Sequence, residues 1–305
     1  MRAVACRKGL CVKVLITGGS GFIGRNLVEE LGSRYQIAAA SSSELNLLDE
    51  DAVREYLRNG HFDAVVHTAT TRSNRRTGAP DDMLDRNCRM YFNLARNRTL
   101  FGRMLHLGSG AEYSRAGLPP QVSESYFDTH VPTDPYGFSK YICTKHAETQ
   151  ENIYVLRLFG VFGKYEAWDV RFISNACARA VKGLPIVIRQ NVMFDYLYVR
   201  ELAKLLEWFL EHEPQQKAYN VCRGEAYSLV QLAEMVAEAA SGAPKIVVRN
   251  PAMGAEYSAN NSRMISEMGG FAFREMSDCV SELYGWYKKH ANEIDPRQLT
   301  FDDSE

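Results

Sequence analysis

A glycine-rich turn between an apolar run and a helical pattern places the strongest constraint on the fold of this chain. The run from Val14 to Ile16 predicts a buried parallel strand, and Arg25–Leu31 predicts a helix. Between them Gly18, Gly21 and Gly24 have the spacing G-x-x-G-x-x-G, which lets the backbone turn sharply and approach a pyrophosphate at the N-terminus of the helix. Glycines alone are weak evidence, because loops often collect them, but the strand before and the helix after make dinucleotide binding the better interpretation.

The composition excludes several other classes of protein. The chain has 305 residues, of which 46% are hydrophobic, and a formal net charge of −1, so it can bury a full core and has no excess of charge for nucleic acid or a membrane surface. No apolar run reaches the roughly 18 residues that span a bilayer. The seven cysteines show no C-x-x-C spacing, which is typical of free thiols in a reducing compartment. We therefore expect a cytoplasmic protein with no metal site, no nucleic-acid partner and no membrane partner.

Strand and helix patterns alternate from the first strand to Gly163 and predict an α/β fold. Parallel strands joined by helical crossovers give a doubly wound, Rossmann-type sheet. After Gly163 the alternation loosens, which indicates a smaller C-terminal α/β part that faces the substrate. We therefore expect a dinucleotide-binding domain at residues 11–163 with a strand and helix that return to it at about 192–222, a substrate-binding part at 164–191 and 223–294, and a polar, frayed tail at 295–305.

The end of the second predicted strand bears on which dinucleotide is bound. Folds that prefer NAD place Asp or Glu there to accept hydrogen bonds from the ribose hydroxyls, whereas this strand, Gln36–Ala40, runs into Ser41-Ser42-Ser43. Hydroxyl groups can bind a 2′-phosphate, and Arg25 or Arg72 would lie near enough to meet it, so the sequence favours NADP(H). NAD stays possible, because the serines also tolerate a plain ribose and Glu44 can fold back to bind its hydroxyls. In a third interpretation the serines are only a solvated loop.

Tyr136 and Lys140 form a Y-x-x-x-K pair on a predicted helix. At positions i and i+4 both side chains lie on one face. A phenol has a pKa near ~10, and an ammonium group one turn away favours the phenolate and lowers that pKa. The pair can then pass a proton to or from a sugar or alcohol oxygen, which the hydroxyl of Ser109, at the end of a parallel strand, can also hydrogen-bond. Asp134 is well placed as the N-cap of this helix, with Pro135 at its first position.

Together these motifs resemble the extended short-chain dehydrogenase/reductases of the NAD-dependent epimerase/dehydratase family, which act on nucleotide sugars. The resemblance runs from about residue 12 to residue 290 and is carried by Thr17–Gly24, by Ser109 and by Tyr136–Lys140. Weaker similarities lie at Arg157–Gly160, Asp195–Val199 and Tyr219–Val221. The resemblance implies that Ser109, Tyr136 and Lys140 are the catalytic set, that Lys140 also binds the nicotinamide ribose and that the glycine turn binds the pyrophosphate.

Two groups of binding residues follow from the motifs and the resemblance. The third predicted strand ends in small and hydroxyl residues, which can lie against a cofactor, and a long helix at about 82–98 follows it. The predicted cofactor-binding residues are Gly18, Gly21, Phe22, Ile23, Gly24, Ser41, Ser42, Thr68, Ala69, Thr70, Asn87, Tyr136 and Lys140. The predicted substrate-binding residues are Arg72, Ser109, Gly110 and Arg189. Arginine suits bidentate contact with a phosphate, although a structural salt bridge explains Arg189 equally well.

Differences from the family's motifs limit which of the family's reactions this chain is expected to catalyse. Its sugar dehydratases follow the catalytic Thr with Asp-Glu, which shuttle the proton needed to eliminate water, whereas Gly110-Ala111 stand here. Its 4-epimerases keep NAD bound and usually have an acidic residue directly after the second strand. Residues 43–49 are similar to the matching part of GDP-fucose synthase, an NADPH enzyme that also epimerises through a Cys whose place Ala111 takes. Glu112 is an alternative base, although a surface carboxylate is the simpler interpretation.

The sequence therefore predicts an NADPH-dependent oxidoreductase that reduces a 4-keto-6-deoxyhexose linked to a nucleotide, in polysaccharide biosynthesis. A 4-epimerase with tightly bound NAD is the alternative within the family, and a non-catalytic dinucleotide-binding sensor is the alternative of another class. The resemblance also implies a homodimer, in which the helices at about 82–98 and 135–151 pair across a two-fold axis.

Histidines and cysteines on predicted strands and helices are expected to be structural. His67 and His106 lie in strands, where we expect core histidines with satisfied nitrogens. Cys88, Cys143 and Cys177 lie on helices, where packing is a better explanation than reactivity.

Overall fold

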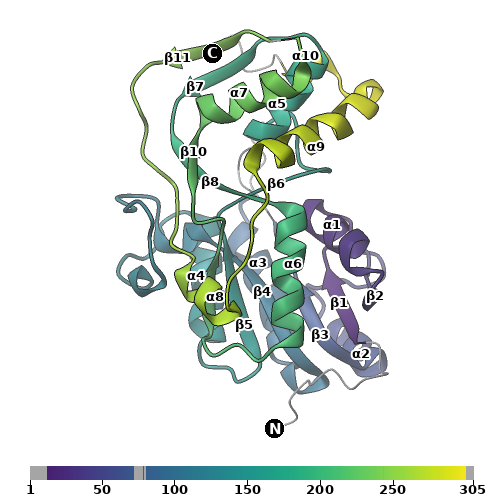
Figure 1. The fold of residues 1–305 in the computed structure, drawn as a ribbon. Coiled ribbons are helices and arrows are strands. Elements are labelled where there is room, and N and C mark those ends of the chain that lie inside the picture. The colour runs from purple at the N-terminus through teal and green to yellow at the C-terminus, as the bar shows by residue number, and fades with distance from the viewer. Residues whose placement is uncertain (1–11, 72–77, 79, 243, 300–305) are drawn as a thin grey trace.

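A six-stranded parallel sheet forms the larger part of the protein (Figure 1). The computed structural model describes residues 12–71, 78, 80–242 and 244–299. The strands follow the order β2-β1-β3-β4-β5-β9, and each neighbouring pair is parallel. They are β1 (Lys13–Thr17), β2 (Gln36–Ala38), β3 (Phe62–His67), β4 (Phe101–Ser109), β5 (Ile153–Leu158) and β9 (Ala218–Val221). The order reverses between β1 and β3, and the carboxyl ends of the strands beside such a reversal form a crevice where α/β proteins bind ligands.

Helices cover both faces of this sheet, which confirms the predicted doubly wound α/β fold. On one face α1 (Phe22–Leu31) packs against α6 (Val199–Glu211), and on the other α2 (Glu50–Gly60), α3 (Met83–Ala95) and α4 (Pro135–Ala147) lie side by side. Side chains alternate along a strand, so successive residues of β1 point to opposite faces of the sheet. Val14 and Ile16 pack with α1 and α6, and Leu15 packs with the helices on the other face.

Local sequence signals set the start of α4, the helix with the Y-x-x-x-K pair. The carboxylate of Asp134 accepts a hydrogen bond from the backbone N–H of Gly137 at 2.8 Å, and Pro135 occupies the first helical position. Both features were expected from the sequence, since such a cap satisfies an otherwise unpaired N–H and proline is pre-organised for the first turn. Because Tyr136 lies in this first turn, the cap fixes where its side chain leaves the helix.

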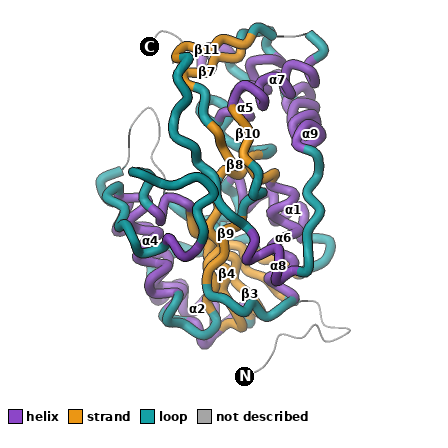
Figure 2. Tube along the Cα trace, turned by 60° about the vertical axis from the view of Figure 1, so that its left-hand side comes forward, coloured by secondary structure: helices purple, strands orange, loops and turns teal. Residues whose placement is uncertain are grey.

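The smaller part packs three helices around a core of its own (Figure 2). The helices are α5 (Phe172–Val181), α7 (Leu229–Ala240) and α9 (Met276–Lys289). A three-stranded sheet comprises β10 (Ala226–Ser228), β8 (Met193–Tyr198) and β6 (Gly160–Phe162), and a two-stranded one comprises β11 (Ile246–Asn250) and β7 (Ile186–Gln190). The remaining short elements are α8 (Ser262–Met268), α10 (Pro296–Leu299) and the 3-10 turns Arg98–Leu100, Gly110–Tyr113, Glu124–Tyr126 and Ala291–Glu293.

Segments from the second half of the chain return to the larger part. β9 extends the main sheet beside β5, and Met264 on α8 packs into the same core as α1 and α6. Residues 251–261, which we call the return segment, run from β11 back to α8 (Figures 1 and 2). The backbone of Tyr257 in this segment donates to the carbonyl of Met193 and accepts from the N–H of Asp195, at 2.9 and 3.0 Å. The two parts are therefore joined by several passages of the chain.

Of the segment at about 192–222, α6 and β9 lie with the main sheet, and β8 belongs to the small sheet. Two details differ from the expectations. α8 lies in the stretch expected for the substrate-binding part, yet it packs on the main core. The tail is not frayed up to Leu299, because α10 buries that side chain and its carbonyl accepts a hydrogen bond from Arg179. The domain boundaries themselves stay a prediction. No helix among the described residues is long and apolar enough to cross a membrane.

Candidate active site

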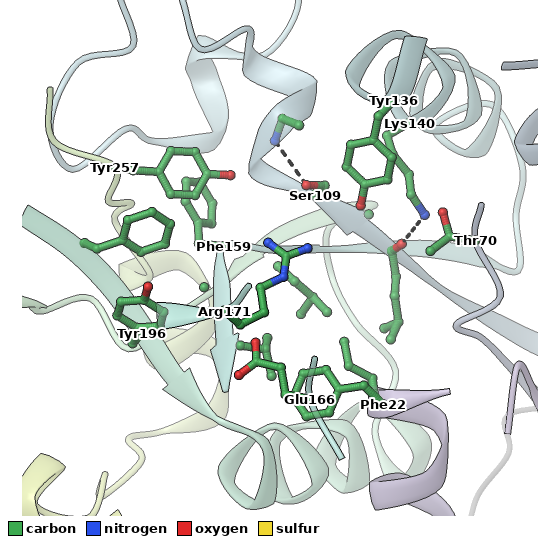
Figure 3. A pocket seen from close by; sticks show the side chains of 18 of the residues that line it. Phe22, Thr70, Ser109, Tyr136, Lys140, Phe159, Glu166, Arg171, Tyr196 and Tyr257 are labelled. Carbon is green, nitrogen blue, oxygen red and sulfur yellow. Dashed lines mark hydrogen bonds between the residues drawn. The ribbon is translucent and has the colours of Figure 1, made fainter. Parts of the chain in front are cut away.

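A cavity of about 620 Å³ lies at the carboxyl ends of β3, β4 and β5 and reaches the smaller part; we call it the cleft (Figure 3). Seven of the predicted site residues line it: Phe22, Ile23, Thr68, Thr70, Ser109, Tyr136 and Lys140. The other predicted residues that the structure describes lie outside its lining: Gly18, Gly21, Gly24, Ser41, Ser42, Ala69, Asn87, Gly110 and Arg189. Arg72 lies outside the described residues.

The glycine turn behind the cleft leaves no room for side chains. Gly18 has a φ of +70°, and a Cβ there would lie 2.9 Å from the backbone of Ala69. A Cβ on Gly24 would lie 2.2 Å from the carbonyl oxygen of Gly18. The first turn of α1 has no acidic residue, so its free N–H groups and dipole favour an anion. The turn therefore fits the pyrophosphate of a dinucleotide, as the spacing predicts.

Three side chains with acid–base chemistry meet on one side of the cleft. Tyr136 and Lys140 come from α4, and Ser109 ends β4 beside them, with the two hydroxyl groups directed into the same space in Figure 3. The ammonium of Lys140 is 4% exposed and donates to the carbonyl of Leu107 at 2.8 Å. A positive charge so placed favours the phenolate form of a neighbouring tyrosine. The residues therefore have the geometry that the Y-x-x-x-K spacing predicts.

A buried carboxylate orients Ser109. The hydroxyl of Ser109 accepts a hydrogen bond from the backbone N–H of Ala111 at 3.2 Å. The backbone N–H of Ser109 donates to the carboxylate of Glu112 at 2.9 Å. The second oxygen of Glu112 accepts from the hydroxyl of Thr144 and from the guanidinium of Arg157, each at 2.8 Å. The expectation that Glu112 is a surface carboxylate is wrong, because its side chain is fully buried. With both oxygens engaged in hydrogen bonds, Glu112 supports the serine turn, and it does not line the cleft.

Asn87 links the loop after β3 to α4. Its side-chain oxygen accepts from the backbone N–H of Thr71 at 2.7 Å, and its amide nitrogen donates to the Thr71 carbonyl at 3.0 Å and to the hydroxyl of Ser139 at 3.3 Å. Ser139 in turn donates to the carbonyl of Tyr136 at 2.7 Å. Asn87 thus holds the two elements that flank the cofactor crevice, and direct contact with a cofactor stays a prediction.

The carboxylate of Glu44 folds back onto the end of β2. It accepts from the backbone N–H of Ser41 at 2.8 Å and from its hydroxyl at 2.7 Å, and these hydrogen bonds lower the pKa of the Glu44 carboxyl. A negative charge therefore stands close to the end of β2. The preference for NADP(H) was based on the absence of an acidic residue there, so this charge argues against it. Arg25 does not offset it, because its guanidinium lies over the ring of Tyr165, 3.7 Å from the centroid. Whether Ser41 and Ser42 bind the ribose stays a prediction.

The arginines that the cleft contains were not predicted. Arg189 is exposed on β7 and does not line the cleft, whereas Arg115 and Arg171 do. Each cleft arginine lies in an irregular stretch near a residue with positive φ, Ser114 at 61° and Tyr165 at 70°. Such backbone conformations are uncommon outside glycine and cluster at functional sites. No periodic pattern marks these stretches, so the sequence offered no signal for them.

Aromatic and acidic side chains complete the wall opposite the Ser109 side. Glu166 is 8% exposed and accepts a hydrogen bond from Ser174 at 2.6 Å, and in Figure 3 its carboxylate lies below the side chain of Arg171, whose guanidinium points away from it. Tyr257 lies between the rings of Phe159 and Phe194, with centroids 5.0 and 4.9 Å away. The other aromatic residues that line this wall are Phe172 and Tyr196. This wall is therefore apolar with a few charged groups, as small-molecule sites usually are.

Two neutral imidazoles lie in the sheet beneath Lys140. The Nδ1 of His67 is 2.8 Å from the hydroxyl of Thr17, and its ring stacks on that of His106 at 5.3 Å. Burial lowers the pKa of His67 to about 3 and also lowers the pKa of His106, with the nearby Lys140 acting in the same direction. The expectation of satisfied nitrogens is wrong for His106, because neither of its nitrogens has a hydrogen-bond partner among the described residues.

Comparison with known proteins gives the site a context. A family model described as "NAD dependent epimerase/dehydratase family" matches residues 14–222. A probable dTDP-glucose 4,6-dehydratase of Sinorhizobium fredii is 27% identical over 330 residues, covering 90% of this chain and 93% of the relative. The UDP-glucose 4-epimerase of Thermotoga maritima, solved with UDP-glucose, has a TM-score of 0.79 at 18% identity and covers 92% of this chain and 99% of its own. The GDP-mannoheptose C4 reductase of Campylobacter jejuni, solved with NADP, has a TM-score of 0.76 at 19% identity, with 91% and 98% covered.

Proposed function

This chain belongs to the NAD-dependent epimerase/dehydratase family, whose members are NAD(P)-dependent enzymes that modify nucleotide sugars, and we propose that it reduces the keto group of a nucleotide-linked 4-keto-6-deoxyhexose. The observation that carries the proposal is the meeting of Ser109, Tyr136 and Lys140 on one side of the cleft, beside the glycine turn. When bound there, the reduced dinucleotide supplies a hydride to the keto carbon.

The residues of the chain then handle the proton. Tyr136 donates its phenolic proton to the oxygen that gains negative charge as the keto group becomes an alcohol. Ser109 hydrogen-bonds the same oxygen, in an orientation held by Ala111 and Glu112. Lys140 holds a positive charge next to the phenolate that remains, and so lowers the free energy of the proton transfer.

Gly110-Ala111 after Ser109 argue against a dehydratase. Neither residue has a group that can move the proton needed to eliminate water, and the nearest carboxylate, Glu112, has both oxygens engaged in hydrogen bonds. Hydride transfer coupled to one proton transfer requires only the three residues already in place. The reductase solved with NADP that resembles this chain in fold is in keeping with that reaction.

Arg171 takes the place that the sequence assigned to Arg189. Arg171 lines the cleft, and Figure 3 shows its guanidinium directed into the open space. Arginine matches a phosphate with two parallel hydrogen bonds. In this proposal Arg171 binds the diphosphate of the nucleotide sugar on the wall that faces Ser109.

A 4-epimerase with bound NAD is a second candidate, because of Glu44. Its carboxylate stands at the end of β2, where it would repel a 2′-phosphate and accept hydrogen bonds from a plain ribose. An epimerase oxidises and reduces the same carbon, so it needs no free cofactor. Such an enzyme should carry one equivalent of dinucleotide through purification.

One set of assays separates these candidates. We expect the purified protein to oxidise added NADPH in the presence of a 4-keto-6-deoxyhexose linked to CDP, GDP, UDP or dTDP. Tyr136→Phe should lower kcat by about 10²–10⁴-fold, because the proton donor is lost, while the Kd for NADPH stays unchanged. If the purified protein retains NAD and turns over substrate with no cofactor added, the proposed function is wrong and the 4-epimerase is the correct assignment. Undiminished activity of the variant would show that Tyr136 is not the donor.

The homodimer is also a proposal. α3 and α4 pack side by side on one face of the sheet, which is where the family resemblance places the seam of a two-fold dimer. A particle of twice the mass of one chain in light scattering at micromolar concentration would support it, and a monomer would exclude it.

A further inference from the structure

Residues 163–171, which we call the Arg171 stretch, lie between β6 and α5 and belong to no helix or strand. Glu166 and Arg171 line the cleft from this stretch (Figure 3), and Tyr165 within it has a φ of +70°. A stretch of this kind has no continuous ladder of backbone hydrogen bonds, so contacts with neighbouring elements must fix its path. The contacts that fasten it therefore decide where the guanidinium of Arg171 lies.

Asn26 of α1 fastens the start of the Arg171 stretch. Its side-chain nitrogen donates to the carbonyl of Phe22, one turn earlier in α1, and to the carbonyl of Lys164, each at 2.8 Å. The residue is fully buried, although asparagine is less favourable than alanine inside a helix. The bond to Lys164, which lies 138 residues further along the chain, accounts for a buried amide at this position.

Tyr165 makes a second set of contacts with α1. Its hydroxyl donates to the carboxylate of Glu29 at 2.7 Å, and the guanidinium of Arg25 lies over its ring, 3.7 Å from the centroid. The ring also meets that of Trp286 on α9 edge to face, with centroids 5.4 Å apart. Contacts near the surface contribute little one by one, but together with Asn26 they hold two successive residues of the stretch against one helix.

The far end of the Arg171 stretch is fastened to α5. The side chain of Asn175 donates to the carbonyl of Trp168 at 3.0 Å, and the backbone N–H of Arg171 donates to the carbonyl of Ala167 at 2.9 Å. Arg171 therefore lies at the end of a short turn that is tied to α1 on one side and to α5 on the other. Because the tie to α5 is local in sequence, the tie to α1 is the one that relates Arg171 to the glycine turn.

We propose that Asn26 and Tyr165 position Arg171 for the nucleotide sugar by fastening its stretch to α1, the helix whose N-terminus receives the dinucleotide. Phe22, which is bonded to the same amide as Lys164, itself lines the cleft in the first turn of α1. The amide thus sets the spacing between the helix that receives the dinucleotide and the guanidinium that receives the diphosphate. Asn26 and Tyr165 are positioning residues, because they act through Arg171. The inference rests on the proposed function, since it takes Arg171 as the phosphate contact.

The test is a double-mutant cycle on KM. Asn26→Ala removes the bond to Lys164, and we expect KM for the nucleotide sugar to rise about tenfold, the value of one ordinary hydrogen bond, with kcat and the Kd for NADPH nearly unchanged. In an Arg171→Gln background the same change should not raise KM further, because Asn26 acts through Arg171. An equal rise in both backgrounds, or none in the wild type, would overturn the proposal.

Two further variants guard against an effect on folding alone. Tyr165→Leu removes the partly exposed ring that Arg25 covers, so we expect it to fold even if Asn26→Ala does not, and it should give the same cycle. Asn93→Ala is the matched control, because Asn93 is a buried asparagine on α3 that donates to the carbonyl of Leu47 at 2.9 Å, on the other face of the sheet. It should lower Tm without changing KM.

Hydrogen exchange separates this inference from the proposed reaction. The backbone N–H of Arg171 is bonded within the stretch, so mass spectrometry of a peptide covering residues 163–171 reports how firmly the stretch is held, with no ligand added. We expect exchange to be about tenfold faster in Asn26→Ala and Tyr165→Leu, and unchanged in Asn93→Ala. Unchanged exchange in the first two would overturn the inference even if the reductase assay succeeds. Faster exchange, with no turnover of any nucleotide sugar, would overturn only the reaction.

Discussion

The two walls of the cleft are built by different physical means. The wall that carries Ser109, Tyr136 and Lys140 belongs to regular elements, a strand end and the first turns of a helix, and its side chains are fixed by hydrogen bonds to the backbone. On the opposite wall Arg171 and Tyr257 come from irregular stretches, the first just before α5 and the second in the return segment. In the proposed function the first wall handles the proton, and the second wall binds the nucleotide sugar.

The largest expected effect is on the free energy of unfolding, and it comes from the buried pair of Glu112 and Arg157 that supports the first wall. Glu112→Gln leaves the buried charge of Arg157 with only the longer contact to Glu148, at 3.8 Å, and breaking a buried pair costs about 3–5 kcal/mol. Both side chains are at most 1% exposed, and the guanidinium also lies over the ring of Phe127, 4.2 Å from its centroid. Urea unfolding should show the loss directly.

An exposed pair provides the control for that change. Arg96 and Glu50 are 2.9 Å apart at the surface, with side chains 58% and 49% exposed. Exposed pairs contribute about 0–1 kcal/mol, so Glu50→Gln should hardly alter unfolding. Equal losses for Glu112→Gln and Glu50→Gln would mean that the buried pair does not support the serine turn.

The next effect is a pH dependence of stability, and it comes from Asp195 at the junction between the two parts. Asp195 on β8 is fully buried and accepts hydrogen bonds from the backbone N–H groups of Arg223 and Gly224 at 2.9 and 2.8 Å. Burial raises the pKa of Asp195 to about 6, above its ordinary value of 3.8. Its protonated form is therefore favoured on folding, and this contribution is complete below the unfolded pKa and is lost as the pH rises through about 6.

The size of that loss follows from the shift. A displacement from 3.8 to about 6 corresponds to about 3 kcal/mol between pH 4 and 7. Asp195→Asn stays neutral and accepts through its amide oxygen, so its unfolding free energy should lack this fall over the same range. A wild-type stability that is flat between pH 4 and 7 would contradict the assignment.

Arg171, on the second wall, is expected to act on the affinity for the nucleotide sugar. Arg171→Gln should raise KM for the nucleotide sugar by about 10–100-fold, the value of a charge-assisted hydrogen bond of roughly 1.5–3 kcal/mol. The Kd for the dinucleotide is the second readout and should not change, because in the proposal Arg171 binds the nucleotide sugar alone. Arg189→Gln on β7, where the side chain is exposed, is the control. An equal rise in KM for this variant would mean that Arg189 also contacts the phosphate.

The smallest expected effect separates the two dinucleotides. Glu44→Gln removes the negative charge at the end of β2, and NADPH should gain about tenfold in affinity over NADH relative to the wild type. Ser43→Ala, next to it, leaves that charge in place and should shift the ratio far less. A ratio that does not respond to Glu44→Gln would mean that this carboxylate lies away from the ribose.

The first wall was accessible from the sequence because local rules govern it. The glycine spacing, the Asp134 cap and the i, i+4 pair each depend on neighbouring residues, and the fold and family that they indicated are confirmed. Glu112 was misjudged because its burial depends on Arg157, a partner 45 residues away. Arg171 was missed for the same reason: nothing in its own stretch of sequence indicates which cavity its side chain enters.

The late return of the chain to its first half has a consequence for synthesis of the protein. Until α6 has left the ribosome, the apolar face of α1 has no cover, and until β9 follows, β5 is an open edge of the main sheet. The residue after the end of β4, Gly110, meets the phenol of Tyr257 only after more than four-fifths of the chain has been made. We therefore expect nascent chains stalled before β9 to need chaperones and to be open to proteases, and chains released beyond α8 to become resistant in one step.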